Sequence, residues 1–272
     1  MSEPVVRIRD LTIALPKGAD RPHAVEGLNL DLEAGKILCV VGESGSGKSM
    51  SAYALTGLLP RALKPTAGTI LFEGRDLLTL DEPAWRGLRG RRIAMVFQDP
   101  TASLQPMLSI GTQLTDHVRH HLGLSRTAAR SRAAELLERV RVPSPEAALR
   151  RYPYQFSGGQ LQRIAIAIAI ACEPKVLIAD EPTTALDVTV QAGVLRLLRE
   201  LTDDLGLAVL LVTHDLGVMS AVADTVAVMR NGAVVEHGSR YQVIREPRTD
   251  YARELVESLP HTPPPGVGED PS

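Results

Sequence analysis

The sequence of 272 residues contains few aromatic side chains and two cysteines, Cys39 and Cys172. Two cysteines supply neither a disulfide framework nor a four-cysteine metal site, and their apolar surroundings predict that both are buried. Aromatic residues make up 3% of the chain, and the net charge is −2. Because phosphate tracking needs a basic surface and single strands need stacking rings, we expect no nucleic-acid partner.

Long apolar runs are also missing. The longest apolar stretch, Ile164–Cys172, is far too short to span a bilayer. The initial residues SEPVVRIRD lack the apolar core of a secretory signal. We therefore expect a chain that does not cross a membrane and that lies in the cytoplasm.

The first third of the sequence reads as short strands. Residues 5–15 and 24–35 alternate apolar and polar side chains, which predicts an antiparallel layer. Residues 36–42, KILCVVG, are continuously apolar, as in a parallel strand covered on both faces. They run into GESGSGKS at 42–49, and residues 49–60 then have the length of a helix that ends at Pro60.

The pattern changes to helix between residues 100 and 155, where alanine, leucine and arginine dominate. Strand patterns return at 176–180 and 207–215, separated by a helix that Asp187 caps and Gly206 stops. Residues 225–238 predict a hairpin with Asn-Gly at its turn. The chain length suits one large domain with an inserted subdomain, followed by a proline- and glycine-rich tail that we expect to be disordered.

The run IAIAIAIA at 164–171 has two possible interpretations. Its period of two formally indicates a strand, but alanine is also apolar, so the alternation does not separate two chemically different faces. Ser157 is a good N-cap and Pro174 a natural stop, and a strand here would leave three residues before the next one. We therefore predict a helix.

GESGSGKS satisfies the phosphate-loop pattern between a strand and a helix. Its glycines let backbone amides turn inward, and the following helix adds partial positive charge, so polyphosphate is the expected ligand. Lys48 is expected to reach the β- and γ-phosphates, and the Ser49 hydroxyl to bind Mg²⁺. The predicted nucleotide-binding residues here are Gly42, Glu43, Ser44, Gly45, Ser46, Gly47, Lys48, Ser49 and Met50.

Polar side chains follow the other buried strands. Asp180 and Glu181 end the strand at 176–180, where Asp180 would hold Mg²⁺ and Glu181, pointing the other way from an extended backbone, would activate water as general base. Gln98 and His214 also follow strands. Gln98 or His214 alone would be typical of an ordinary polar cap at the end of a strand. We expect the strand ends that carry Gln98, Glu181 and His214 to lie at one edge of the sheet, and that edge would be the active site.

GESGSGKS, Gln98, FSGGQ at 156–160, VLIADE at 176–181, TALD at 184–187 and His214, in this order, resemble the ATP-binding cassette (ABC) ATPases over essentially the whole folded chain. The resemblance implies Walker A, Q-loop, signature, Walker B, D-loop and H-loop motifs. Gln98, Glu181 and His214 would then be catalytic, and Gln98 would join Ser49 and Asp180 at Mg²⁺. It implies an α/β fold, a P-loop (RecA-like) ATPase core with an antiparallel β-subdomain and an inserted α-helical subdomain, using ATP and Mg²⁺.

This resemblance sets the expected domain boundaries. One ATPase domain would occupy residues 1–240, with its core at about 1–98 and 163–240 and the helical subdomain at about 99–162. A short helical extension would follow at 241–260, and a disordered tail at 261–272.

The signature motif explains why the chain carries a second glycine-containing helix start. Ser157, Gly158, Gly159 and Gln160 offer a hydroxyl, amides and a helix dipole to an anion. In the family, two cassettes dimerise head to tail, and the signature of one covers the ATP held by the other. The implied partner is a second cassette, identical or paralogous.

Longer segments, including RYPYQFSGGQLQR at 151–163 and EPRTDYARELVESLP at 246–260, look like the peptide and nickel importer branch. That branch implies two transmembrane permeases, an extracellular solute-binding protein and a peripheral place on the cytoplasmic face of the plasma membrane. Two departures stand out. Only Leu15 or His23 is available upstream of the phosphate loop where cassettes usually stack an aromatic on adenine, and no cysteine follows Cys172 for an iron–sulfur cluster.

Alternatives remain open. Di- or oligopeptides, nickel and glutathione-like compounds all fit as cargo. Two soluble classes of the family are alternatives: translation factors, which normally carry two cassettes, and DNA-repair ATPases, which carry a long coiled coil. A third alternative, a nucleotide-binding module without turnover, would lack Lys48 or Glu181. His117 and His121 have i, i+4 metal-ligand spacing, but no third ligand is evident, and a solvated surface is favoured.

Overall fold

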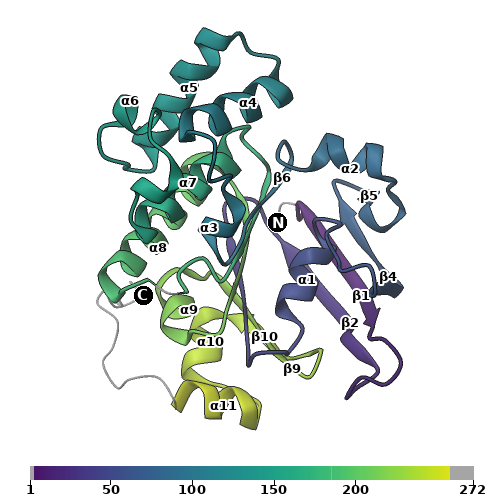
Figure 1. Ribbon diagram of the computed structural model, residues 1–272. Helices are drawn as coiled ribbons and strands as arrows, with labels where there is room; N and C mark the ends of the chain where they lie inside the picture. Colours follow the sequence, from purple (N-terminus) through teal and green to yellow (C-terminus); the bar gives the residue numbers. More distant parts are fainter. Residues whose placement is uncertain (1–2, 185, 258–272) are drawn as a thin grey trace.

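The computed structural model describes residues 3–184 and 186–257. Two β-sheets, with helices between and around them, make up the molecule (Figure 1). Within the described residues, no helix is both long and apolar enough to traverse a bilayer. The predicted tail at 261–272 and the last residues of the predicted extension lie outside the described ranges.

The smaller sheet is antiparallel, with the strand order β2-β1-β4-β5. Its strands are β1 (Val6–Ala14), β2 (His23–Leu32), β4 (Lys64–Phe72) and β5 (Arg75–Asp76). Along β1, buried side chains such as Val6 and Ile8 alternate with more exposed ones, because one face of the strand covers a core. This confirms the predicted antiparallel layer.

The larger sheet has the order β10-β9-β3-β8-β7-β6. Its strands are β3 (Ile37–Val41), β6 (Ile93–Val96), β7 (Val176–Asp180), β8 (Ala208–Thr213), β9 (Thr225–Arg230) and β10 (Ala233–Ser239). All neighbours pair in parallel except β9 and β10, which form the predicted hairpin. Its turn residues Asn231 and Gly232 have φ of 49° and 90°, the left-handed conformation that favours this dipeptide.

Helices cover both faces of the larger sheet (Figure 1). They are α7 (Gly158–Ile170), α8 (Val188–Leu205) and α9 (Leu216–Val222) on one face and α1 (Lys48–Ala54), between the two sheets, on the other. In β3, Ile37, Cys39 and Val41 face the first group, whereas Leu38 and Val40 face α1 and the smaller sheet. A strand enclosed in this way must be continuously apolar, which is why its sequence shows no alternation. Both cysteines are buried, as predicted.

The predicted helical insert is present. It contains α3 (Pro100–Ser103), α4 (Ile110–Leu122), α5 (Arg126–Arg139) and α6 (Pro145–Ala148). In Figure 1, α4, α5 and α6 lie at the upper part and α3 lies nearer the middle. Ala129, Ala133 and Leu136 lie on the buried face of α5 at the expected helical spacing. The remaining elements are η1 (Leu77–Thr79), α2 (Glu82–Leu88), η2 (Pro153–Gln155), α10 (Arg240–Arg245) and α11 (Asp250–Glu257). On these elements we propose the domain boundaries that the sequence suggested.

Two helix predictions had different outcomes. The run is helical over residues 164–170, with Ala171 as the C-cap, and Ile164, Ile166 and Ile170 are all buried. Because α7 is enclosed on nearly every side, its sequence has no polar face and hence no helical period. The helix expected to reach Pro60 instead ends at Ala54, since Gly57 adopts a left-handed φ of 64° that a helix cannot contain.

Candidate active site

The loop from Gly42 to Gly47 joins β3 to α1 and requires glycine at two positions where other backbone atoms approach closely. A Cβ atom at Gly42 would lie 2.1 Å from the carbonyl oxygen of Met229, and one at Gly47 would lie 2.4 Å from that of Ala24. Gly47 also has φ of 105°, which strains any other residue. The loop is therefore held tightly between the two sheets, with the N-terminus of α1 directly behind it.

Lys48 is 5% exposed and curls back over this loop. Its Nζ donates to the carbonyl oxygens of Gly42 at 2.7 Å and Glu43 at 2.8 Å. Burial lowers the pKa of the Lys48 ammonium, although Glu181 and Asp180 oppose that effect. The structure thus holds one desolvated cation at the loop, beside the first turn of a helix whose amides have no intrahelical partner.

Ser49 and Asp180 come together at the other side of the loop. The Ser49 hydroxyl donates to Asp180 Oδ1 at 3.0 Å, and Asp180 is 3% exposed. Burial raises the pKa of the Asp180 carboxyl, and the hydrogen bond from Ser49 partly offsets it. Hydroxyl and carboxylate oxygens are the ligands that Mg²⁺ prefers, so the side chains fit the expected ion.

Glu181 is the centre of a polar cluster. Its carboxylate accepts hydrogen bonds from Gln98 Nε2 at 3.0 Å and from Thr184 Oγ1 at 2.9 Å, and His214 Nδ1 lies 3.0 Å from Oε1. The side chain of Glu181 is 17% exposed, whereas Gln98, Thr184 and His214 are exposed, so the carboxylate itself is shielded and its partners border solvent. Sequence reasoning identified three of these residues but missed Thr184, three positions after Glu181.

The expected backbone at Glu181 was wrong. We expected an extended residue, but Glu181 has φ of 47°, in the left-handed region. Its N–H still donates to the carbonyl oxygen of Val212 at 2.8 Å, and the chain then turns out of the sheet. The carboxylate is therefore directed by a turn and by its three partners, instead of by the pleat of a strand.

A cavity of about 810 Å³ joins these groups. The phosphate loop, Gln98, Glu181, Thr184 and His214 line it, and Asp180 is linked to it through Ser49. Gln98, Glu181 and His214 follow β6, β7 and β8, which are parallel, so their carboxyl ends meet at one edge. The predicted common edge is thus confirmed.

One wall of this cavity contains only one of the two residues, Leu15 and His23, that we expected in place of an adenine-stacking aromatic. Leu15 lines it, but His23 does not, and His23 Nδ1 instead lies 3.7 Å from Glu26 Oε1. Arg21 and Ala24 complete this wall, and Arg21 Nη2 donates to the Gly45 carbonyl oxygen. Among the described residues that line the cavity, none is phenylalanine, tyrosine or tryptophan. Sequence reasoning missed Arg21.

The signature residues lie elsewhere. Ser157 caps α7 through a capping box, in which its Oγ accepts from Gln160 N and Gln160 Oε1 accepts from Ser157 N. Ser157 and Gly158 are exposed, and residues 157–160 do not line the cavity. Gly159 has a packing reason as well, because a Cβ there would lie 2.3 Å from Val190 Cγ1 of α8.

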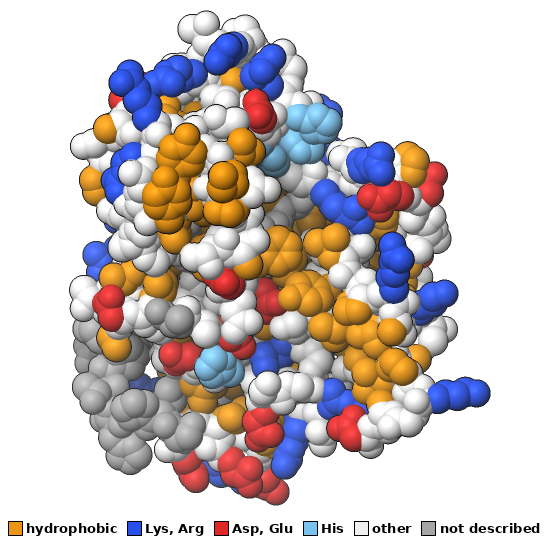
Figure 2. All heavy atoms as spheres, viewed as in Figure 1, with side chains coloured by type: hydrophobic (Ala, Val, Ile, Leu, Met, Phe, Trp, Pro, Cys, Tyr) orange, Lys and Arg blue, Asp and Glu red, His pale blue; other side chains and the backbone are white. Residues whose placement is uncertain are grey.

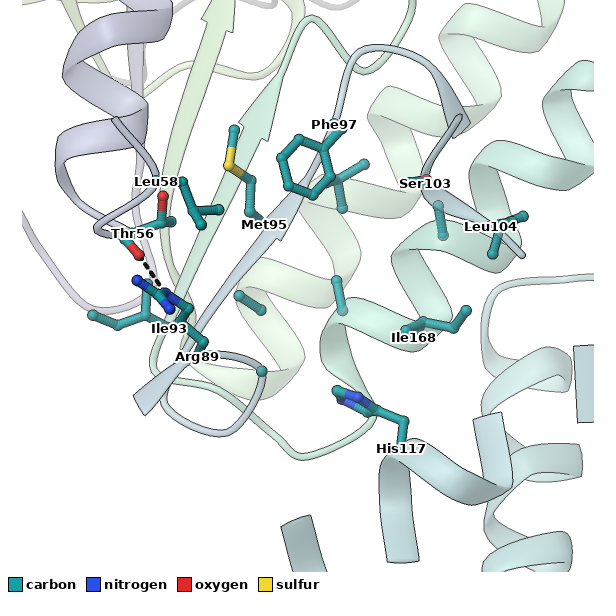
Figure 3. A pocket seen from close by; sticks show the side chains of 15 residues that line it. Thr56, Leu58, Arg89, Ile93, Met95, Phe97, Ser103, Leu104, His117 and Ile168 are labelled. Carbon is teal, nitrogen blue, oxygen red and sulfur yellow. Dashed lines mark hydrogen bonds between the residues drawn. The ribbon is translucent and has the colours of Figure 1, made fainter. Parts of the chain in front are cut away.

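A second hollow, of about 240 Å³, lies between β6 and the helices α4 and α7 (Figure 3). Its lining is mainly apolar and includes Leu58, Met95, Phe97 and Ile168. Phe97 is adjacent in sequence to Gln98, so this hollow begins where the polar cluster around Glu181 ends. Figure 2 shows a band of hydrophobic side chains on the same side of the molecule, from beside α3 across α1.

His117 also borders this second hollow (Figure 3). The prediction that its side chain lies on a solvated surface was therefore wrong. The side chain is half-buried, and burial lowers the pKa of His117 to about 4, helped by the neighbouring His121. The two rings are 4.7 Å apart. In the described ranges, no group of three or more histidine, cysteine, aspartate or glutamate side chains is placed to hold a metal ion.

Comparison with known proteins gives one consistent result. A family model described as "ABC transporter" matches residues 25–184. The oligopeptide transport ATP-binding protein OppD of Bacillus subtilis is 44% identical over 94% of this chain and 72% of its own length. The dipeptide transport ATP-binding protein DppD of the same organism is 44% identical, over 95% of this chain and 77% of its own.

A solved structure gives the same answer for the fold. The dimeric post-hydrolysis state of the ATP-binding cassette MJ0796, bound to ADP and Pi, superposes with a TM-score of 0.76 at 28% identity. The match covers 86% of this chain and 98% of that one, and the likeness includes the P-loop core predicted from the sequence. Because the family model and these relatives match most of the folded part, including the loop and strand ends that build the cavity, the chain belongs to the ABC transporter family.

Proposed function

We propose that this chain is the ATP-hydrolysing subunit that powers peptide import through separate membrane proteins. One observation carries the ATPase part: Lys48, the Ser49–Asp180 pair and the Glu181 cluster line or adjoin a single cavity at the carboxyl edge of the larger sheet. The peptide part rests on the relatives OppD and DppD, whose names describe oligopeptide and dipeptide transport.

The phosphate loop would bind the polyphosphate of ATP. Amides of the loop and of the first turn of α1 offer hydrogen bonds and partial positive charge, and the Lys48 ammonium would exchange its loop carbonyls for phosphate oxygens. Ser49, Asp180 and Gln98 would hold Mg²⁺. When bound, that ion neutralises charge on the phosphates.

Glu181 would act as the general base. A water molecule near its carboxylate would lose a proton to Glu181 as its oxygen attacks the γ-phosphorus, and ADP would leave. Gln98 and Thr184 donate to Glu181 Oε2 and His214 contacts Oε1, so both oxygens of the base would be oriented before the substrate arrives. Gln98 and His214 also line the cavity, so both side chains would be close to a bound ATP.

Ser157, Gly158, Gly159 and Gln160 would serve a neighbouring molecule. They form an exposed helix start that does not border the cavity of their own chain. In a head-to-tail dimer this start would close over ATP held by the partner, and loss of the γ-phosphate would release it. The MJ0796 cassette is described as dimeric, which supports this arrangement.

Two membrane permease subunits would be the mechanical partners, at the cytoplasmic face of the membrane, and an extracellular binding protein would deliver the solute to them. The apolar hollow beside Phe97 is a candidate docking place for a permease segment (Figure 3). The position of the hollow supports this docking, because Phe97 is adjacent to Gln98, which donates to Glu181. A permease segment that contacts Phe97 would therefore move or hold Gln98 and change its hydrogen bond to Glu181.

Uptake in cells tests the cargo. In a strain that lacks this chain, we expect wild type, but not Lys48→Ala, to restore accumulation of labelled di- and oligopeptides. Restoration of labelled nickel or glutathione uptake without peptide uptake would replace the proposed cargo. Purification from membranes should recover two polytopic proteins, whereas recovery of ribosomes or DNA would favour a non-transport cassette.

A further inference from the structure

We infer that the C-terminal helix α11 positions the phosphate loop, with Tyr251 as the positioning residue; the inference rests on the proposed ATP-binding function. Tyr251 is 4% exposed, and its hydroxyl accepts a hydrogen bond from the backbone N–H of Glu43 at 3.1 Å. The two residues are 208 positions apart in the sequence. A segment after the last strand therefore holds the first turn of the loop after β3.

The peptide unit that Tyr251 contacts is the one that also holds Lys48. The N–H of Glu43 and the carbonyl of Gly42 belong to the same planar peptide group. That carbonyl oxygen accepts from Lys48 Nζ at 2.7 Å, while the N–H on the opposite side donates to Tyr251. Rotation of this plane would move the acceptor of the ammonium, so the tyrosine hydroxyl fixes the resting position of Lys48.

Helix α11 is itself firmly attached to the sheet. Glu236 of β10 is 8% exposed and accepts from the backbone N–H groups of Arg248 and Thr249 and from the Thr249 hydroxyl, at 2.8–3.1 Å. The Arg230 guanidinium lies 4.5 Å from the centre of the Tyr251 ring. These contacts place α11 against the β9–β10 hairpin, at the bottom of Figure 1.

The same hairpin supports the middle of the loop. The N–H of Gly232 donates to the Ser46 carbonyl oxygen at 2.9 Å. Leu255, one turn after Tyr251 on α11, lines the cavity that the loop borders. The hairpin and α11 thus hold the outward-facing groups of the loop at two points, which leaves its inward amides to a polyphosphate. A neutral hydrogen bond of this kind changes affinity by a modest, measurable factor.

The test removes the hydroxyl alone. For the full chain with Tyr251→Phe, we expect KM for ATP and the Kd of a fluorescent mant-ATP probe to rise about fivefold, equivalent to about 1 kcal/mol, with kcat within about twofold. The ring and its contact with Arg230 remain, and the melting temperature checks that the variant is folded. Tyr241→Phe on α10, where the tyrosine is 63% exposed, is the matched control and should change neither constant.

Hydrogen exchange gives a readout that does not depend on hydrolysis. In nucleotide-free wild type, the Glu43 amide should exchange slowly, and in Tyr251→Phe it should exchange faster. An unprotected Glu43 amide in wild type, an unchanged exchange rate in the variant or an unchanged mant-ATP Kd would each overturn the inference. Wild type that neither binds mant-ATP nor hydrolyses ATP, with Glu43 protected, would instead refute the proposed function.

Discussion

At the scale of single residues, the chemistry converges on Glu181. Its carboxylate has hydrogen-bond contacts with side chains that follow β6 and β8 and with Thr184 of its own loop. Neighbouring Asp180 has a different environment, because it is buried and bound to Ser49. In the proposed mechanism, the two adjacent carboxylates would take separate tasks, metal binding for Asp180 and proton transfer for Glu181, because different partners surround them.

Replacement of Glu181 by glutamine tests this division. Glu181→Gln keeps the size of the side chain but cannot take a proton, so phosphate release should fall by about 10²- to 10⁴-fold while ATP binding stays intact. Steady-state phosphate release and equilibrium ATP binding measure the two effects. Glu173→Gln, an exposed carboxylate before β7, is the control. Hydrolysis at the wild-type rate by Glu181→Gln would exclude Glu181 as the base.

At the scale of elements, the start of α7 combines a capping box with close packing against α8. Gly158 and Gly159 are adjacent, yet their surroundings differ. A Cβ at Gly158 would lie 3.6 Å from Leu186 Cδ2, an ordinary contact, whereas one at Gly159 would lie 2.3 Å from Val190 Cγ1. The second glycine is thus required by helix packing, independently of any ligand.

Alanine substitutions separate these two positions. Gly159→Ala should lower the free energy of unfolding by about 1 kcal/mol or more, because Val190 or the helix must shift. Gly158→Ala should leave it unchanged or raise it slightly, since alanine favours helix over glycine. Thermal or urea unfolding of both variants checks this, and equal losses of stability would contradict the packing explanation for Gly159.

At the scale of the whole molecule, the proposed head-to-tail dimer would give each chain one half of two different ATP sites. The cavity with Lys48 and Glu181 is lined without the signature residues, which form an exposed helix start on another part of the surface. If closure adds three hydrogen bonds to a γ-phosphate, each worth about 1.5–3 kcal/mol, dimer affinity gains about a thousandfold or more. ADP, which lacks this phosphate, would leave the dimer open.

Ser157→Arg should therefore block dimer closure and turnover without weakening ATP binding. Light scattering in the Glu181→Gln background should detect a dimer with ATP but not with ADP, and Ser157→Arg should abolish it. Ser125→Arg is the matched control, because Ser125 also caps an exposed helix start, that of α5. Both variants lose a helix cap worth about 1 kcal/mol, so a difference between them would not come from lost capping. Unchanged turnover in Ser157→Arg would contradict an ATP site shared between two chains.

The sequence predicted the elements around the site well, because local rules decide them. A continuously apolar strand, a glycine loop and a helix were predicted in order from residues 36–60, although the helix ends earlier, at Ala54, and the hairpin followed from Asn231 and Gly232. The strand ends bearing Gln98, Glu181 and His214 were grouped correctly because parallel strands share one edge. The roles assigned to these residues stay predictions.

Other contacts had no local signal. Thr184 reaches Glu181 because the backbone turns there, Arg21 enters the cavity from the loop between β1 and β2, and Tyr251 meets Glu43 from the far end of the chain. An isolated threonine, arginine or tyrosine is ordinary in a sequence. Its importance arises when folding places it beside a particular atom, and that atom can be hundreds of residues away.

By itself, the sequence determined the chemistry this protein carries: a phosphate loop, two carboxylates after a buried strand and a second glycine-containing helix start. These follow from residue types at short, fixed spacings, which backbone geometry converts directly into local structure. Only the tertiary structure decided which groups act together. It separated the signature from its own cavity, turned Glu181 toward three partners and set α11 against the phosphate loop, because long-range packing, and not spacing, fixes those distances.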